Sequence, residues 1–307
     1  MAQITVQMVK ELRERTQAGM ADCKSALVEA EGDMEKAVEI ILKKGLAKSA
    51  KRAGAIAAEG EVCSAVAEDR KSGVLVEVNI QTDFAARNDK FRTFARNVTD
   101  LALQASAGDN LDELKYPGTD KTVAQVRDEL IAQIGEKITV RRWEKVVAKE
   151  GFVADYVHLG GKIGVLVEMG VADELAGRPE VKQLADDIAM HIAAMNPAYL
   201  ERSEVASAAV DKQKEIFEAQ LRDEGKPEQA WPKIIEGKLN KWYSEVCLLE
   251  QESVTESGTK ISALCEKVGK AIGGDVSVRR FVRFERGEGI EKVVDDFASE
   301  VAKMAGG

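Results

Sequence analysis

The stretch Val74–Phe94, VLVEVNIQTDFAARNDKFRTF, decides how the chain is organised. Its first part follows Gly73 and is rich in Val, Leu and Ile, as is typical of a buried β-strand. Thr82 or Asp83 then precedes alanines and charged residues, which is the pattern of a helix start. We therefore expect a strand-to-helix corner at Thr82-Asp83-Phe84.

This corner has two interpretations. Thr82 or Asp83 can accept hydrogen bonds from the unpaired amides of the first helical turn, where a carboxylate also suits the helix dipole. Phe84 would then be a core aromatic. Alternatively, the Phe84 ring protrudes as a functional wedge that a partner can reach. The spacing of the residues alone favours the cap with a core aromatic.

The composition limits the class of protein. A chain of 307 residues is long enough for two or three domains with their own cores. Its net charge of −9 argues against a dedicated nucleic-acid binder, because neutralising phosphates requires a concentrated basic face. We therefore expect no direct contact with nucleic acid.

Cysteine and histidine usage argues against structural metal or disulfides. The four cysteines form no CxxC pair and only two histidines are present, a pattern typical of free thiols in a reducing compartment. The N-terminus lacks the apolar segment of a signal peptide, and no apolar run is long enough to span a bilayer. We expect a cytoplasmic protein with no cofactor, no metal and no membrane contact. The absence of a transit sequence favours a bacterial protein.

Residues 1–44 predict a three-helix unit. Apolar residues recur at helical spacing in three short segments that Gly19 and Gly32 separate. Such a unit resembles the ubiquitin-associated (UBA-like) fold, a small binding module, and the Gly19-Met20 corner resembles the loop that such domains use for contacts. Met20 is nevertheless more often a core residue. Residues 45–58 are rich in Lys and Ala and predict a helical or flexible linker.

The rest of the chain contains a divergent internal repeat. GVLVEV at 73–78 recurs as GVLVEM at 164–169, and IGEKITVRRW at 134–143 recurs as IGGDVSVRRF at 272–281. A helical pattern follows each copy of the first motif. This order predicts an α+β fold with two core subdomains of common design, each with antiparallel strands covered by helices. We expect these subdomains at 59–144 and 145–286.

The second copy carries an insertion. The first pair of motifs is displaced by 91 positions and the second pair by 138, which leaves 47 additional residues in the second copy. Apolar residues spaced by three and four on both sides of Gly225-Lys226-Pro227 predict an antiparallel helical hairpin at about 203–250. With little core of its own, the hairpin would suit packing against a partner or a second copy of the chain.

Residues 287–307 predict a C-terminal helical module with an apolar stripe. The helix either docks on its own domain or enters the groove of another protein. Taken alone, the pattern favours docking on its own domain.

No enzyme signature is present. The sequence contains no Gly-Lys-Ser/Thr phosphate loop, no GxSxG, no HExxH and no GxGxxG after a strand. His158 and His191 are more often packed or surface residues than catalytic bases when each stands alone. We expect a protein that acts by binding and makes or breaks no bond.

Two long motifs resemble one known family. LRERTQAGMADCKSAL at 12–27 and EVNIQTDFAARND at 77–89 are similar to motifs of elongation factor Ts, the guanine-nucleotide exchange factor for the GTPase elongation factor Tu. The order of modules also matches over essentially the whole chain. The resemblance implies a GDP-bound GTPase as partner and favours the protruding Phe84.

The resemblance also implies roles for particular residues. Thr82, Asp83, Phe84 and Ala85 match the corner implicated in dislodging Mg²⁺ from the GTPase, so that GDP leaves and GTP then displaces the factor. Ala85 stands where the family pattern has Val, which would remove apolar contact beside the wedge. The resemblance further implies a possible homodimer through the helical hairpin. Further partner contacts are expected at Leu12, Met20, His158, Ile290, Val294 and Phe297.

A rival hypothesis is a non-catalytic adaptor or scaffold that uses the UBA-like module and the coiled hairpin. Exposure of Asp83 and Phe84 discriminates between the two hypotheses, because the wedge requires both on the surface.

Overall fold

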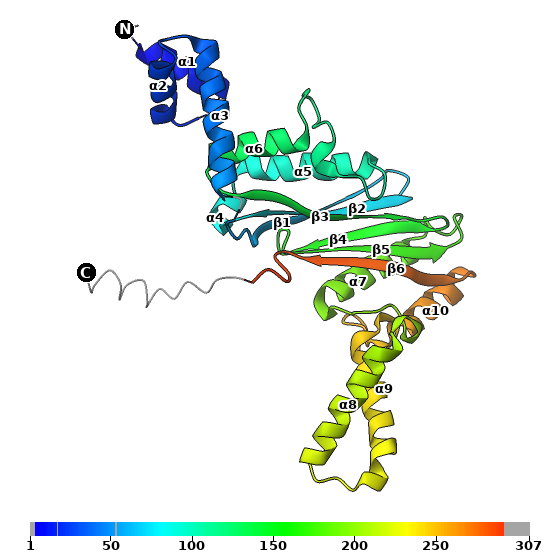
Figure 1. Cartoon of the computed structure of the whole chain (residues 1–307). Coiled ribbons are helices and arrows are strands. Elements are labelled where there is room, and N and C mark those ends of the chain that lie inside the picture. The colour runs from blue at the N-terminus through cyan, green and yellow to red at the C-terminus, as the bar shows by residue number, and fades with distance from the viewer. Residues whose placement is uncertain (1–3, 17, 53, 292–307) are drawn as a thin grey trace.

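The computed structural model describes residues 4–16, 18–52 and 54–291. It is a mixture of helices and antiparallel sheets, an α+β fold (Figure 1). Within these described ranges, no helix combines the length and the apolar character needed to cross a membrane.

The first sheet has the order β1-β2-β3, with both pairs antiparallel. Its outer face is covered by helices that come between β2 and β3 in the chain (Figure 1). Val74 and Val76 pack there against Phe91, Phe94 and Val98. The elements are β1 (Glu59–Val66), β2 (Ser72–Ile80), α4 (Asp83–Ala86), α5 (Asp89–Gln104), η1 (Leu111–Glu113), α6 (Val123–Ile134) and β3 (Ile138–Val147).

The second sheet repeats this order as β4-β5-β6, again antiparallel throughout. Val165 and Val167 pack against Leu184 and Ile188 of its covering helix. The elements are β4 (Phe152–His158), β5 (Ile163–Val171), α7 (Pro179–Met195), η2 (Arg202–Glu204), η4 (Leu248–Glu250), α10 (Ile261–Ile272) and β6 (Val276–Glu285). Because β3 continues to Val147, a boundary at residue 144 would divide a strand.

The two sheets pack face to face, with their helices on the outer sides (Figure 1). The repeated glycines lie at this interface. A Cβ on Gly73 would lie 2.9 Å from Cγ1 of Val153, and one on Gly164 would lie 2.6 Å from Cγ1 of Val62. Each copy of the GVLVE motif therefore uses its glycine to let the opposite sheet approach closely.

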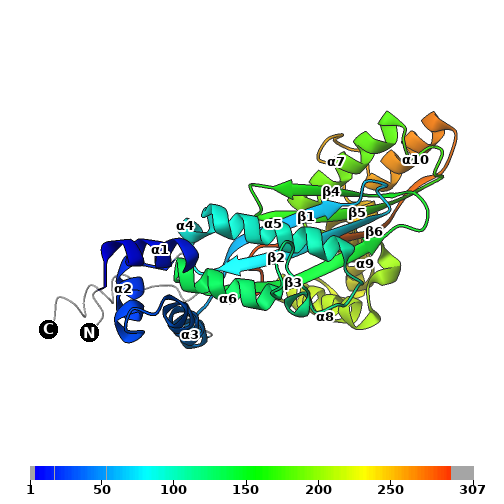
Figure 2. The ribbon, with the colours of Figure 1, turned by 90° about the horizontal axis from the view of Figure 1, so that it is seen from above.

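The N-terminal helices are α1 (Val6–Thr16), α2 (Met20–Glu29) and α3 (Met34–Arg52). They enclose a small core that includes Leu12, Cys23 and Leu27. α3 continues through most of the segment expected to be a linker and lies against α6. The three helices stand beyond the end of the sheets at which α4 lies (Figure 2).

A helical hairpin extends from the second sheet on the side away from the first (Figure 1). It consists of α8 (Ser207–Asp223) and α9 (Trp231–Val246), joined through η3 (Glu228–Ala230). Leu221 is the one fully buried side chain of these two helices, both of which lie in the described part of the chain. At the base, Arg202 forms an ion pair with Glu250 and lies over the ring of Tyr243.

Candidate functional site

The predicted corner is a capped, very short helix between β2 and α5. Oγ1 of Thr82 accepts a hydrogen bond of 3.2 Å from the backbone N–H of Ala85, which is the N-cap interaction expected from the sequence. α4 ends at Ala86, and the side chain of Asn88 caps a new helix by accepting from the N–H of Lys90. The helical segment is therefore broken, and the break keeps the corner distinct from α5.

Glu136, from the loop between α6 and β3, fixes this corner. Its Oε2 accepts the backbone N–H of Thr82 at 2.9 Å, and its Oε1 accepts the Thr82 hydroxyl at 2.8 Å. The side chain of Gln81 in turn accepts the N–H of Lys137. Glu136 was not among the site residues expected from the sequence. The sequence does contain one indication of it. The internal repeat has a glutamate at position 136 in its first copy and a glycine at the matching position 274 in its second copy.

Phe84 projects from this corner into solvent. Its exposed fraction is 80%, whereas Ala85 and Ala86 pack against the core beneath. The interpretation of Phe84 as a core aromatic is therefore wrong. The Asp83 side chain is about half exposed and pairs with Arg87 one helical turn later, a surface ion pair that adds little stability. Asp83 and Phe84 are thus both accessible at the surface, which is what the wedge hypothesis requires.

The tip of the β4–β5 hairpin lies at the same edge of the molecule. The backbone N–H of Val62 in β1 donates to the carbonyl of Gly161 at 2.8 Å. The first residue of β1, Glu59, pairs with Ile80, the last residue of β2 before the corner. His158 is half buried, and its Nδ1 is hydrogen-bonded to the hydroxyl of Tyr156 at 2.9 Å. The next residue, Leu159, is 70% exposed.

The turn after β6 completes this edge. Glu77 is fully buried between the sheets, and its carboxylate accepts hydrogen bonds from Arg141, Arg142, Asn79 and the backbone N–H of Gly287. Burial alone would raise the pKa of Glu77, but the hydrogen bonds from Gly287, Asn79 and the two arginines together hold it below its usual value. A buried carboxylate therefore anchors the turn that leads to the C-terminal segment.

The other predicted contact residues differ in accessibility. Met20 is 41% exposed, and Ile290 is half buried at the end of the turn. Leu12 has no exposed surface because it lies at the centre of the three-helix core, so the prediction that it contacts a partner is wrong. Val294 and Phe297 lie outside the described residues.

Cys63 and His191 are titratable residues outside this edge, and burial shifts the pKa of each. Burial raises the pKa of the Cys63 thiol to about 12, which makes the thiolate scarce at neutral pH. Burial likewise lowers the pKa of His191, which is hydrogen-bonded to Gln251. In the part of the chain that the structure describes, no group of three or more His, Cys, Asp or Glu side chains is placed to hold a metal ion.

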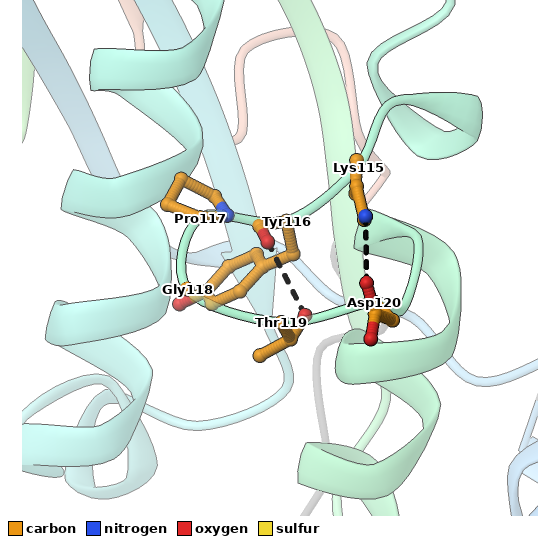
Figure 3. A pocket seen from close by; sticks show the side chains of 6 residues that line it. All are labelled: Lys115, Tyr116, Pro117, Gly118, Thr119 and Asp120. Carbon is orange, nitrogen blue, oxygen red and sulfur yellow. Dashed lines mark hydrogen bonds and ion pairs between the residues drawn. The ribbon is translucent and has the colours of Figure 1, made fainter.

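A shallow hollow in the loop before α6 is lined by residues 115–120 (Figure 3). Lys115 pairs with Asp120 at 2.6 Å across it, and the hydroxyl of Thr119 donates to the carbonyl of Tyr116 at 3.2 Å. These groups are paired with one another within the loop. The hollow is therefore a weaker candidate for a ligand site than the exposed corner is for a protein-binding site.

Fold and site together define an α+β protein whose candidate site is a projecting aromatic corner, a shape suited to recognising another protein. The sequence profile of the family described as Elongation factor TS matches residues 81–288, a range that begins at this corner. The chain belongs to the elongation factor Ts family. It is thereby an elongation factor of protein biosynthesis, with the nucleotide-exchange role of that family.

Individual relatives match over almost the full chain. Elongation factor Ts of Clostridium perfringens (strain SM101 / Type A) is 48% identical over 306 residues, which cover 99% of both chains. Elongation factor Ts of Clostridium botulinum (strain Alaska E43 / Type E3) is 47% identical over 305 residues, with the same coverage. Elongation factor Ts of Syntrophotalea carbinolica is 47% identical over 303 residues, which cover 98% of this chain and 99% of the relative.

Proposed function

We propose that this chain is the guanine-nucleotide exchange factor of elongation factor Tu and that it acts through the corner Thr82–Ala85. The observation that carries this proposal is the Phe84 ring, which is 80% exposed on a corner whose backbone is fixed by a cap and by Glu136. An exposed aromatic on a rigid support loses little conformational freedom when it binds.

The proposed action is on the Mg²⁺ of the GDP-bound partner. Mg²⁺ bridges nucleotide oxygens and protein ligands. It neutralises much of the negative charge on both, which would otherwise repel each other. Transfer of the Phe84 ring into an apolar slot of the GTPase is worth roughly 2–3 kcal/mol, which offsets part of the cost of displacing the metal's surroundings. The Asp83 carboxylate brings negative charge to the same boundary.

Exchange of this kind needs no bond chemistry. Binding energy is used to favour a GTPase conformation that holds nucleotide and Mg²⁺ weakly. The coupling is reciprocal, so nucleotide must weaken the factor's affinity by the same ratio. GTP, when it binds, therefore releases the factor.

The remaining contacts follow from the same proposal. We expect the N-terminal module to touch the GTPase through Met20, and His158 to contact it beside the corner. The C-terminal segment would add Ile290, Val294 and Phe297. We also propose that the subdomains expected at 59–144 and 145–286 are two units whose boundary falls after the end of β3 at Val147. The helical-hairpin insertion at about 203–250 would pair with a second copy. The place of action is then the cytoplasm, where elongation occurs.

The test is release of a fluorescent GDP analogue from elongation factor Tu in the presence of catalytic amounts of this chain. We expect the wild type to accelerate release, whereas Phe84→Ala and the double variant Asp83→Ala/Phe84→Ala fail to do so. Val147→Ala is the matched control, because Val147 is also an exposed apolar residue but lies at the opposite end of β3. No acceleration by the wild type would refute the exchange function and leave the adaptor hypothesis.

A further inference from the structure

The internal repeat provides a second version of the corner for comparison. The strands align at displacements of 91 and 138 residues, and both copies carry a register shift at the matching place, after Glu77 and after Glu168. α6 and α10 both end at a glycine with a left-handed backbone, Gly135 and Gly273. At these displacements Phe84 corresponds to Leu175 and Glu136 to Gly274.

In the second copy, the apolar residue of the corner is folded inward. Leu175 is partly buried and packs against the core of the second sheet. A Cβ placed on Gly274 would collide with Cδ1 of Leu175. Leu175 therefore occupies the space that a side chain at position 274 would need.

In the first copy, a glutamate stands at the matching position. The carboxylate of Glu136 is tied to the backbone N–H and the hydroxyl of Thr82, two residues before Phe84. Its side chain therefore lies against the start of the corner, and Phe84 remains on the surface. Burial of an aromatic ring is favourable, so an inward position that is closed to the ring would account for the exposed Phe84.

We propose that Glu136 is a positioning residue that keeps Phe84 on the surface, because it fills the space that Gly274 leaves open to Leu175 in the second copy. This proposal rests on the proposed function for its biological meaning, but the position of the ring can be measured separately. Glu136 acts on the exchange reaction only through Phe84 and has no contact of its own with nucleotide.

The inference distinguishes volume from charge. Glu136→Gly copies the second repeat and opens the space, so the ring should fold inward. Glu136→Ala removes the carboxylate without adding the backbone freedom of glycine, and should act in the same direction. Glu136→Gln retains the volume and one hydrogen-bond acceptor for Thr82, and should leave Phe84 exposed.

The position of the ring is read from ¹⁹F NMR of the chain labelled with 4-fluorophenylalanine. The sequence has eight phenylalanines, and the resonance absent from Phe84→Leu identifies the ring. We expect a large H₂O/D₂O solvent isotope shift for Phe84 in wild type and Glu136→Gln, and a shift typical of a buried ring in Glu136→Gly and Glu136→Ala. A ring that stays exposed in both small variants, whatever their activity, would overturn the proposal.

Exchange is measured on the same four proteins. If the exposed ring falls to about one tenth of the population, stimulation of GDP release should fall about tenfold in proportion. Glu136→Gln should retain it. A wild type that fails to stimulate release refutes the proposed function alone, since the NMR result then still decides where Glu136 places the ring. An inward ring with undiminished exchange would overturn the role of Glu136 in the reaction.

Discussion

The backbone N–H of Gly287 donates a hydrogen bond of 2.7 Å to Oε1 of Glu77, a residue 210 positions earlier in the chain. This bond joins the turn after the last strand to the middle strand of the other sheet. Arg142 reinforces the joint, since it bonds Glu77 and also reaches the carbonyl of Glu285 at 3.1 Å. The buried carboxylate of Glu77 thus connects the two halves of the repeat.

Replacing Glu77 by glutamine should destabilise the protein strongly. The Arg141 side chain is about three-quarters buried and that of Arg142 about two-thirds. Both would lose the charge of Glu77, and Arg142 would keep only its ion pair with the more exposed Glu288. Leaving buried charges unpaired costs more than the pair contributes, so we expect a loss of about 2–3 kcal/mol in the free energy of unfolding. Urea denaturation followed by circular dichroism measures it.

The matched control is Glu168→Gln, which changes the corresponding residue of the second repeat. Glu168 is partly exposed, so its replacement should alter stability by less than about 0.5 kcal/mol. An equal loss of unfolding free energy in both variants would show that the buried network around Glu77 contributes no more to stability than the partly exposed Glu168.

Glu77 also predicts a pH dependence of stability. Its pKa in the folded protein lies below the ordinary value of 4.5, to which it returns in the unfolded chain. The unfolded state then binds more protons as the pH falls through this range, so the stabilisation is complete above the ordinary value and is lost as the pH falls below it toward the folded pKa.

Unfolding free energies measured from pH 6 down to pH 3 should therefore fall less steeply in Glu77→Gln than in wild type. The one missing titration limits the difference in slope to at most about 1.4 kcal/mol per pH unit. Parallel curves for the two proteins would contradict the lowered pKa of Glu77.

Local patterns were sufficient to predict the corner. A β-branched run predicts a strand and Thr82 predicts a cap, because both depend on neighbours in the sequence. Exposure of Phe84 did not follow from spacing, since periodicity shows which residues share a face but not what covers that face. The carboxylate that fixes the corner is 54 positions away, and a contact of that range has no local signature.

Leu12 shows the opposite case, a residue that was expected to contact a partner but is buried. Its position in a motif shared with a known family suggested a partner contact, yet three helices enclose it completely. A shared motif records both packing and recognition, and only the surroundings of the side chain separate them. The fully buried Glu77 likewise required the turn at Gly287, far away in the chain, to be recognised as an anchor.

Leu12 and Met20 should therefore respond differently to truncation. Leu12→Ala leaves a cavity in the small N-terminal core and should cost about 2–5 kcal/mol locally. Met20→Ala removes a side chain that is 41% exposed and should leave stability within about 0.5 kcal/mol while weakening the complex with elongation factor Tu.

Hydrogen exchange of the α2 amides measures the first effect, and titration calorimetry against elongation factor Tu measures the second. Unchanged amide protection in Leu12→Ala would contradict its role in the core. Undiminished affinity in Met20→Ala would remove Met20 from the proposed interface.

The helical hairpin should associate with a second copy through its apolar side chains. Ile216 on α8 is 42% exposed, and α9 has no fully buried residue, so the apolar residues of the hairpin are incompletely covered by its own two helices. Ile216→Asp would place a charge where burial of the exposed part of the isoleucine contributes about 1 kcal/mol per chain, and burying an unpaired charge is costly, so it should shift the assembly to monomer. Ile56→Asp is the matched control, because Ile56 is 41% exposed but lies before β1, outside the hairpin.

Sedimentation velocity over a range of concentrations measures the association. Pairing through the hairpin is supported if wild type and Ile56→Asp form a concentration-dependent dimer and Ile216→Asp does not. A wild type that stays monomeric at every concentration would contradict pairing through the hairpin, and GDP release should then be equally fast with Ile216→Asp.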